Sequence, residues 1–199
     1  MQLYTSPTSP YARLVRVVLA EKQLIDQVEY HFLDPWETPA ELLAVNAACR
    51  VPTLVTGAGE ALTEAGVIVL YLERRYPEPR LMARDGVESV HARLGLALGC
   101  MDAGAGVLME RRHGDPGTPL AQRRAEGLQR ITRSLIEAID GVRPGDPDLG
   151  DLAMAVALNW VEYRFRAEVP WREWSEAAPA WLARINERPA FLETLPPPA

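Results

Sequence analysis

The stretch that decides the fold reads Thr8-Ser9-Pro10-Tyr11-Ala12-Arg13, a polar corner between an apolar N-terminus and an amphipathic segment. Residues 1–4 predict a short strand, and the Thr, Ser and Pro residues after it predict a loop. Ser9 is the expected N-cap and Pro10 the first helical residue, because the N–H that proline lacks has no helical partner there. Beyond the corner, apolar residues recur at the spacing of one helix face, at Tyr11, Leu14, Val15, Val18 and Leu19.

The same corner is a candidate functional site. Free backbone N–H groups and the positive end of the helix dipole favour anions at a helix N-terminus, and a thiolate is one such anion. Ser-Pro pairs that open helices are usually only caps, so this reading needs a companion motif. Arg50-Val51-Pro52-Thr53-Leu54 provides one, because an X-Pro step that runs directly into an apolar strand often marks a shaped, sometimes cis, turn. A helix N-terminus that faces such a proline is typical of a thioredoxin-type site.

The composition favours an acidic enzyme over a nucleic-acid-binding or membrane-binding protein. The chain has 199 residues, 48% of them hydrophobic, with a net charge of −6 and a pI near 5.2. Its 21 basic residues form no long cluster, which argues against nucleic acid or an anionic membrane as the main partner. Neither a targeting segment nor a run of about 20 apolar residues is expected from the sequence, so a cytoplasmic location is predicted.

Cysteine and histidine usage predicts neither disulfides nor a metal site. The two cysteines, Cys49 and Cys100, form no C-x-x-C motif, which indicates a reducing compartment. Cys49 adjoins the Arg50-Val51-Pro52 turn, where it is either a small buried residue or a thiol able to form a mixed disulfide. Cys100 is expected in the core. The three histidines fall in different predicted elements, so no metal ligation is expected.

The chain length suits two compact units of roughly 80 and 110 residues. The first, residues 1–77, predicts an α/β unit with a mixed four-stranded sheet and helices on both faces. In its second strand, Val28, Tyr30 and Phe32 alternate with polar residues, which predicts a half-buried strand. Residues 78–85 are the expected linker. The elements after the first helix are a strand at 28–33, a helix at 40–45, strands at 53–56 and 61–63 joined by a Gly-Ala-Gly turn, and a helix at 66–76.

Residues 86–199 predict an all-helical unit. Asp148 is the expected N-cap of its third helix. The first helix carries Gly95, Gly99, Gly104 and Gly106, each costing up to ~1 kcal/mol against alanine, so a partner helix or a ligand must pack unusually close there. The helices are expected at about 86–111, 119–140, 148–165 and 179–188.

Four local motifs and the order of the two units resemble the cytosolic glutathione S-transferase family over the whole chain. Ser9-Pro10-Tyr11-Ala12 stands where glutaredoxins carry Cys-Pro-Tyr-Cys, and its serine is similar to that of the bacterial branch related to the zeta and theta classes. Residues 46–54 resemble the family's Asn-Pro-x-Gly-Lys-Val-Pro-x-Leu, Thr63-Glu64-Ala65 resembles its Glu-Ser pair, and Asp148-Leu149-Gly150-Asp151 resembles its capping motif. Two departures are that Ala47-Ala48-Cys49-Arg50 replaces Pro-x-Gly-Lys and that Ala65 replaces the serine.

The resemblance implies a thioredoxin-like first unit that binds glutathione as co-substrate, without a metal. Ser9 would donate a hydrogen bond to the sulfur and stabilise the thiolate. Val51, held by a cis Pro52, would pair its backbone with the cysteinyl part of the tripeptide. Glu64 would accept from the γ-glutamyl ammonium, and the backbone N–H of Ala65 would hold the adjacent carboxylate. The implied glutathione site consists of Ser9, Arg50, Val51, Pro52, Glu64 and Ala65.

The resemblance also implies a second substrate and a second copy of the chain. A small apolar electrophile would contact Tyr11, Met101 and Ala105, although the helical spacing of Met101 fits a core residue equally well. Members of the family usually pair as two-fold dimers. Gly95 and Gly99 share a helix face that another backbone could approach, so a homodimer that crosses there is expected.

Three functions remain open on the sequence. The first is conjugation of glutathione to small electrophiles. The second is another glutathione-dependent reaction, either reduction of a disulfide or peroxide or an isomerisation, although a serine in place of cysteine counts against redox turnover. The third is a non-catalytic interaction protein that kept the fold, which the departures at residues 47–50 and at Ala65 keep open.

Overall fold

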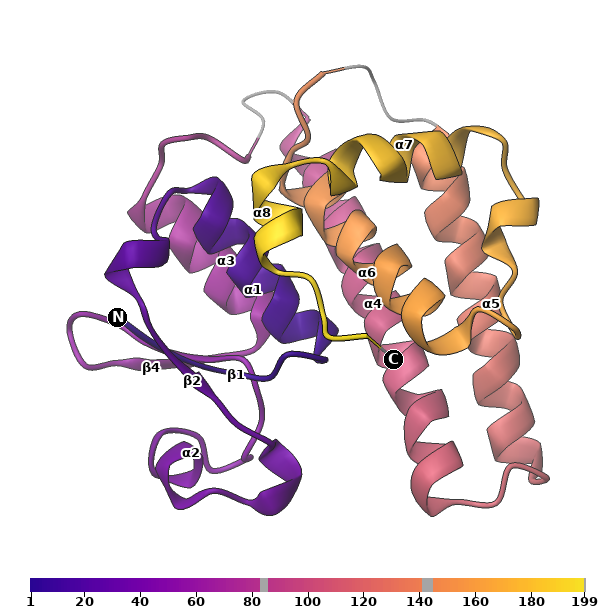
Figure 1. The fold of residues 1–199 in the computed structure, drawn as a ribbon. Coiled ribbons are helices and arrows are strands. Elements are labelled where there is room, and N and C mark those ends of the chain that lie inside the picture. Colours follow the sequence, from indigo (N-terminus) through magenta and orange to yellow (C-terminus); the bar gives the residue numbers. More distant parts are fainter. Residues whose placement is uncertain (83–85, 141–144, 199) are drawn as a thin grey trace. The chain divides into compact units, whose positions relative to one another are not determined.

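The structure, a computed structural model, describes residues 1–82, 86–140 and 145–198. The chain divides into two compact units, residues 1–82 with 187–199 and residues 83–186. Residues 83–85 of the expected linker lie outside the described residues. Figure 1 shows the sheet and helices of the first unit and the helices of the second.

The first unit is built on a mixed four-stranded sheet, which confirms the predicted fold class. Its strands β1 (Gln2–Thr5), β2 (Glu29–Phe32), β3 (Thr53–Val55) and β4 (Ala61–Thr63) lie in the order β2-β1-β3-β4. β1 pairs parallel with β2 and antiparallel with β3, while β3 and β4 form an antiparallel hairpin. A parallel pair needs a crossover, and α1 (Pro10–Glu21) followed by a 3₁₀ turn at Ile25–Gln27 supplies it.

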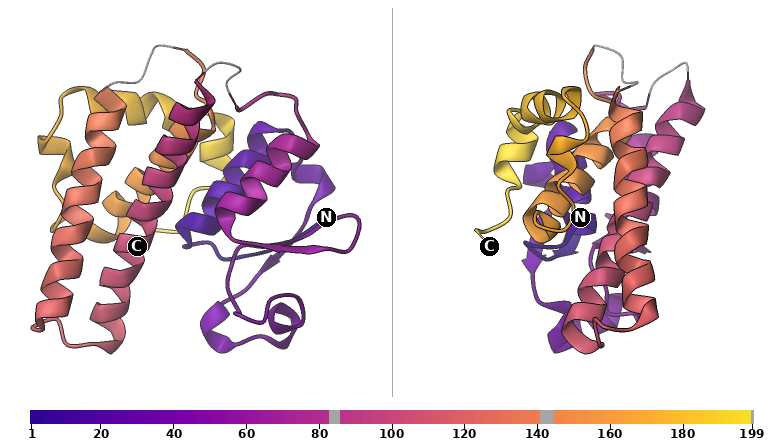
Figure 2. Two further views of the ribbon diagram at one scale, coloured as in Figure 1. Left: turned by 180° about the vertical axis from the view of Figure 1, so that it is seen from behind. Right: turned by 90° about the vertical axis from the view of Figure 1, so that its right-hand side faces the viewer.

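Helices lie on both faces of this sheet. α1 packs against α3 (Ala65–Arg75) on one face, and α2 (Ala40–Val45), which follows a 3₁₀ turn at Pro35–Glu37, contacts β3 on the other (Figures 1 and 2). Four residues of the apolar face of α1 are fully buried, as their spacing predicts, and Tyr11 on the same face is half-buried; the four are Leu14, Val15, Val18 and Leu19. The ranges expected for α2, β3 and β4 agree with the structure to within one residue.

The prediction for β2 is wrong in one respect. Tyr30 is half-buried, but the Phe32 side chain is 57% exposed. β2 is the edge strand of the sheet, so its last residue lacks a neighbouring strand on one side. The Arg16 guanidinium lies 5.7 Å from the centre of the Phe32 ring. Alternation along the chain predicts which face a side chain takes, whereas how much of that face is covered depends on strand order.

A buried lysine ties α1 to the end of α3. Lys22 follows the last residue of α1, and its side chain is completely buried. Its Nζ lies 2.6 Å from a carboxylate oxygen of Glu73, and it donates to the carbonyl oxygens of Tyr76 at 2.7 Å and Pro79 at 3.1 Å. All three donors of the ammonium therefore have acceptors, which makes its burial tolerable.

The second unit is helical. Its elements are α4 (Val87–His113), α5 (Pro119–Asp140), α6 (Leu149–Phe165), a 3₁₀ turn at Trp171–Glu173, and α7 (Ala177–Asn186). α4 packs along both α5 and α6. Residues 149–158 of α6 are all buried, so α6 is the central helix of this unit.

The glycines of α4 allow close helix packing inside the unit. A side chain at Gly104 would collide with the Trp160 ring of α6, and a Cβ at Gly99 would stand 3.0 Å from Cδ1 of Ile131 on α5. The sequence left open whether a helix or a ligand packs against these glycines. At Gly99 and Gly104 it is a neighbouring helix of the same unit. Gly95 is exposed, with no atom within 4 Å of an added Cβ. The expectation that Gly95 and Gly99 together form a free face is therefore wrong for Gly99.

A capping box begins α6, as Asp148-Leu149-Gly150-Asp151 predicts. The Asp148 carboxylate accepts from the Asp151 N–H at 3.1 Å, and the Asp151 carboxylate accepts from the Asp148 N–H at 3.2 Å. Arg93 of α4 pairs with both carboxylates, at 2.7 Å for Asp148. Desolvation by burial, with Asp148 as the next cause, raises the pKa of Asp151. The box therefore also links α6 to α4.

One expectation about membranes needs correction. α4 is long and apolar enough to cross a membrane by length and composition alone, whereas the sequence analysis identified no such stretch. The same property is expected of a core helix in a soluble protein. α4 packs against α5 and α6 through Gly99 and Gly104, and we therefore interpret it as a helix packed within its unit, beside the central helix α6.

The C-terminal segment joins the first unit rather than the helical one. Residues 187–199 group with residues 1–82, and they contain a short helix, α8 (Pro189–Glu193), that the sequence analysis did not predict. Arg188 donates two hydrogen bonds of 2.7 Å to the Glu21 carboxylate at the end of α1. Phe191 is fully buried. These long-range contacts hold the segment on α1, and nothing in the local sequence pattern indicates them.

Candidate functional site

The register of the sheet brings three predicted site segments to one end of it. β1 ends at Thr5 and runs antiparallel to β3, so that Tyr4 lies opposite Thr53. Thr53 in turn lies opposite Thr63, the last residue of β4. The loop that follows β1, the turn that precedes β3 and the residues that follow β4 therefore leave the sheet at the same end. These segments carry Ser9, Val51 with Pro52, and Glu64 with Ala65.

Ser9 caps α1, as predicted. Its backbone is extended, with φ −77° and ψ 124°, and its Oγ accepts a hydrogen bond of 3.3 Å from the Ala12 N–H. Pro10 occupies the first turn. Because this bond uses the hydroxyl as acceptor, the hydroxyl proton remains available, and no acceptor for it occurs in the described part of the chain. A half-buried O–H donor thus stands at the positive end of a helix.

The Val51–Pro52 peptide bond is cis, as the X-Pro step suggested. The turn before it is organised by Asn46, a buried residue to which the sequence analysis gave no role. The Asn46 side-chain amide donates to the Arg50 carbonyl at 3.0 Å and to the Thr53 hydroxyl at 2.9 Å, and its oxygen accepts from the Ala48 N–H at 2.9 Å. The sequence contains one signal for this role of Asn46. The asparagine follows directly after a helix and stands seven residues before Thr53, which begins a strand.

Val51 itself has unpaired backbone groups. Within residues 1–82, 86–140 and 145–198, neither its N–H nor its carbonyl oxygen has a hydrogen-bond partner. Its side chain is half-buried, and β3 begins only at Thr53. An extended peptide segment that aligned with Val51 would satisfy both groups, because unpaired strand edges bind peptides by this pattern. Arg50, one residue earlier, is exposed.

Glu64 has an unusual backbone conformation. Its φ of 66° and ψ of 120° lie outside the regions that residues with a side chain normally occupy. Such residues cost of order 1–3 kcal/mol and cluster at functional sites. Glu64 is exposed, and its side chain does not cap α3. The N–H of Ala65 at the start of α3 has no hydrogen-bond partner among the described residues, so it can bind an anion.

Two buried arginines follow Ser9 on α1, and the sequence analysis did not select them. Arg13 is 6% exposed and Arg16 is 7% exposed. Desolvation by burial, with repulsion from Arg16 as the smaller cause, lowers the pKa of Arg13 to about 10. Burial also lowers the pKa of Arg16. Even so, both guanidiniums are charged at neutral pH. They lie outside the apolar face formed by Tyr11, Leu14, Val15, Val18 and Leu19, so helical periodicity does not predict their burial.

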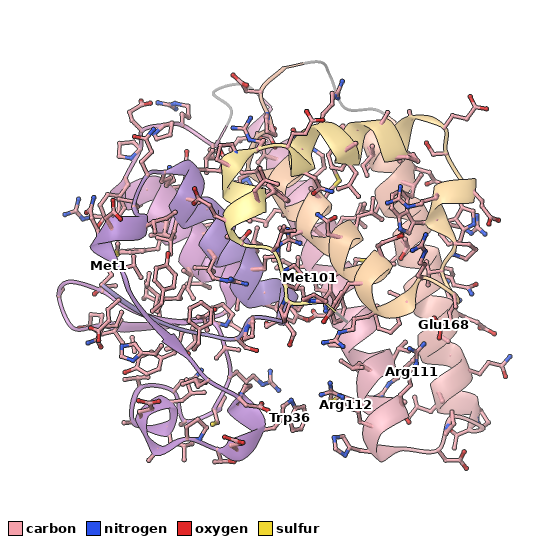
Figure 3. All side chains as sticks on the ribbon, in the orientation of Figure 1. Met1, Trp36, Met101, Arg111, Arg112 and Glu168 are labelled. Atoms are coloured by element: carbon pink, nitrogen blue, oxygen red, sulfur yellow. The ribbon has the colours of Figure 1, made fainter. Side chains whose placement is uncertain are left out.

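The residues predicted for the second substrate lie in different units. Tyr11 is half-buried in the first unit. Met101, which is labelled in Figure 3, and Ala105 belong to α4 in the second unit. Met101 is fully buried and Ala105 is half-buried. Figure 3 also shows Arg111, which is exposed at the end of α4 and pairs with Glu168 at 2.8 Å.

Both cysteines are free thiols. Cys100 is buried, as expected, and burial raises its pKa to about 11. Cys49 is half-buried with φ +50°, the left-handed conformation that favours glycine. It thus keeps the backbone of the glycine that it replaces in the resembling motif. No group of three His, Cys, Asp or Glu residues suitable for a metal occurs in the described ranges.

Comparisons with known proteins agree with this geometry. Residues 3–80 match the family described as glutathione S-transferase, N-terminal domain. The uncharacterized GST-like protein YibF of Escherichia coli is 29% identical over 100% of both chains. Maleylacetoacetate isomerase of Pseudomonas aeruginosa is 38% identical over 50% of this chain and 49% of its own. A glutathione S-transferase from Methylobacterium radiotolerans, solved in complex with glutathione sulfonate, superposes with a TM-score of 0.89 at 28% identity and covers 100% of this chain and 95% of its own.

Proposed function

Because residues 3–80 match the N-terminal domain of the glutathione S-transferase family, we propose that the chain is a member of that family and that it activates glutathione for attack on a small apolar electrophile. The observation that carries this proposal is the Ser9 hydroxyl, which accepts from the Ala12 N–H and has its own proton available. That proton would be donated to the glutathione sulfur. Ser9 would stabilise the nucleophile that glutathione brings and would not itself become covalently bound.

The energies required are within reach of this corner. Each tenfold gain in thiolate at neutral pH needs about 1.4 kcal/mol of selective stabilisation of the anion. A hydrogen bond to a charged group contributes ~1.5 to 3 kcal/mol, and a helix N-terminus ~0.3 to 2 kcal/mol. Together they can raise the ratio of thiolate to thiol by about tenfold to a hundredfold or more. No serine–histidine–aspartate arrangement is needed for this role.

The remaining segments at this end of the sheet would hold the tripeptide. The unpaired backbone of Val51 would bind the cysteinyl part in an extended conformation, beside the cis Pro52 and Arg50. The Glu64 carboxylate would accept from the γ-glutamyl ammonium, and the Ala65 N–H would hold the α-carboxylate. Ala65 lacks a hydroxyl, so this last contact should be weaker than in relatives that carry serine.

The electrophile would contact Tyr11, two residues after Ser9 in the first unit. Met101 has no exposed surface, so the proposal assigns it no contact with the substrate. A panel of electrophiles assayed with glutathione tests this reaction. Conjugation of at least one apolar electrophile is expected, and retention on immobilised glutathione without any turnover would favour a binding protein instead.

One alternative reaction has specific support. Maleylacetoacetate isomerase of P. aeruginosa is 38% identical over half of this chain, and an isomerase would need the same bound thiolate. The panel should therefore include a cis-alkene substrate, with isomer formation as the readout. Disulfide or peroxide reduction is less well supported, because a serine cannot form the mixed disulfide that such turnover uses.

Replacing Glu64 by alanine is expected to raise the Michaelis constant for glutathione about tenfold or more, because a charged hydrogen bond worth ~1.5 to 3 kcal/mol is lost. The rate at saturating glutathione should stay near that of the native protein. This is the result expected when the lost interaction is equally strong in the bound ground state and in the transition state. Glu64→Gln is the matched control, since it keeps the shape and removes the charge. Initial rates over a range of glutathione concentrations measure both constants. An unchanged Michaelis constant would place the γ-glutamyl group elsewhere.

We further propose a cytoplasmic homodimer. Light scattering at micromolar concentration should give a mass of about 44 kDa, twice the 22.0 kDa chain. Gly95→Leu tests the α4 face, because Gly95 is exposed with no atom within 4 Å of an added Cβ. Gly99→Leu does not test it, because the new side chain would meet Ile131 within the same unit. A 22.0 kDa particle would contradict the dimer, and a Gly95→Leu dimer of native affinity would place the interface elsewhere.

A further inference from the structure

Two buried cations on α1 have no anionic partner. Neither Arg13 nor Arg16 forms an ion pair with a carboxylate within the described ranges, and the Nε of each is buried without a hydrogen-bond acceptor. Buried charges in proteins are normally paired, because removing an ion from water costs several kcal/mol. The other buried cation of this unit, Lys22, follows that rule through Glu73. Arg13 and Arg16 do not.

Arg13 and Arg16 instead contact backbone carbonyl groups and aromatic rings. These groups stabilise a cation but carry no net charge that would neutralise it. Arg13 Nη2 donates to the Phe191 carbonyl at 3.4 Å, and the Arg13 guanidinium lies 5.5 Å from the centre of the Phe191 ring. Arg16 Nη2 donates to the Pro7 carbonyl at 3.5 Å, and its guanidinium lies over the Phe32 ring. Both formal charges therefore persist inside the first unit.

These charges lie near Ser9. Pro7 stands two residues before Ser9, and Arg13 donates its backbone N–H to the Ser9 carbonyl at 2.9 Å. Phe32 ends β2 opposite Thr5, at the same end of the sheet as the Ser9 loop. Tyr30 of β2 interacts electrostatically with Arg16, and Glu193 of α8 and Asp26 of the turn before β2 interact with Tyr30 in turn. Glu21 and Arg188 compensate each other.

We propose that Arg16, assisted by Arg13, holds a positive potential at the Ser9 corner that stabilises the anionic form of the glutathione sulfur. This inference rests on the proposed function. The two arginines would act on the sulfur through space and need not touch the tripeptide. An unpaired charge in a low-dielectric interior acts over several ångströms. Two unpaired guanidiniums three residues apart lower the free energy of unfolding. Such a cost is expected where the charges are needed at a functional site.

The test is the pH titration of enzyme-bound glutathione, followed by the ultraviolet absorbance of its thiolate. Arg16→Met, which keeps an unbranched side chain and removes the charge, should move the titration to higher pH. It should also lower the conjugation rate about two- to tenfold at a pH below the midpoint, with little change above it. Arg16→Lys should restore the native titration, because it keeps the charge. Arg74→Met, at an exposed position on α3, is the matched control and should change nothing.

Each outcome decides between the proposals. If the native protein binds no glutathione by calorimetry, the proposed function fails. If it binds glutathione as thiolate and Arg16→Met titrates at the native pH, only this inference fails. A merely structural role predicts that Lys and Met variants behave alike. Should Arg16→Met not fold, Arg13→Met tests the same potential from the other guanidinium, and a native titration in that folded variant would overturn the inference.

Discussion

Replacing Ser9 by alanine is expected to lower the rate of glutathione conjugation at neutral pH by about ten- to a thousandfold, because the donor to the sulfur is lost. The same change removes the cap that the Ala12 N–H uses, so the free energy of unfolding should fall by ~1 kcal/mol. Affinity for glutathione should change less than the rate, since the rest of the tripeptide is bound by other segments. Initial rates, calorimetry and urea denaturation measure the three effects.

The chain offers a matched control for the cap. Thr118 begins α5 in the same way: its Oγ1 accepts from the Ala121 N–H at 3.2 Å, and Pro119 follows it. Thr118→Ala should therefore lose about as much stability as Ser9→Ala, ~1 kcal/mol, and keep the native rate. If Ser9→Ala also keeps the native rate and the native titration of the bound thiol, Ser9 is only a cap and the proposed mechanism is wrong.

Replacing Lys22 by methionine is expected to lower the free energy of unfolding by about 3–5 kcal/mol. The ammonium is fully buried and has three acceptors, so its removal leaves the Glu73 carboxylate uncompensated and two carbonyl oxygens unpaired. Glu73 also accepts from the N–H groups of Leu81 and Met82, which holds the chain after α3 in place. Urea denaturation followed by far-ultraviolet circular dichroism measures the loss.

A second substitution separates the charge from the packing. In the double variant Lys22→Met with Glu73→Leu, no buried charge is left unpaired, so part of the lost stability should return. The exposed Arg74→Met variant should stay within about 0.5 kcal/mol of the native protein. If Lys22→Met costs no more than Arg74→Met, the buried contacts of Lys22 do not stabilise the fold as argued here.

The backbone of the candidate site was predictable because its signals are local. A hydroxyl followed by proline and a helical repeat defines the start of α1 at Ser9 whatever lies around it. An X-Pro step before an apolar run likewise predicted the turn at Val51 and Pro52. The unusual φ of Glu64 and the role of Asn46 were not predictable in this way, because each depends on how two neighbouring segments meet.

The sequence by itself determined the order and bounds of most elements, the cap of α1 and the capping box of α6, since each follows from contacts within a few residues. Only the tertiary structure decided which positions are covered. It left Phe32 exposed on an edge strand, packed Gly99 against Ile131, brought Phe191 back to α1, and enclosed Arg13 and Arg16 without a carboxylate. Periodicity specifies the direction of a side chain, whereas its burial and its charge partners depend on segments distant in the chain.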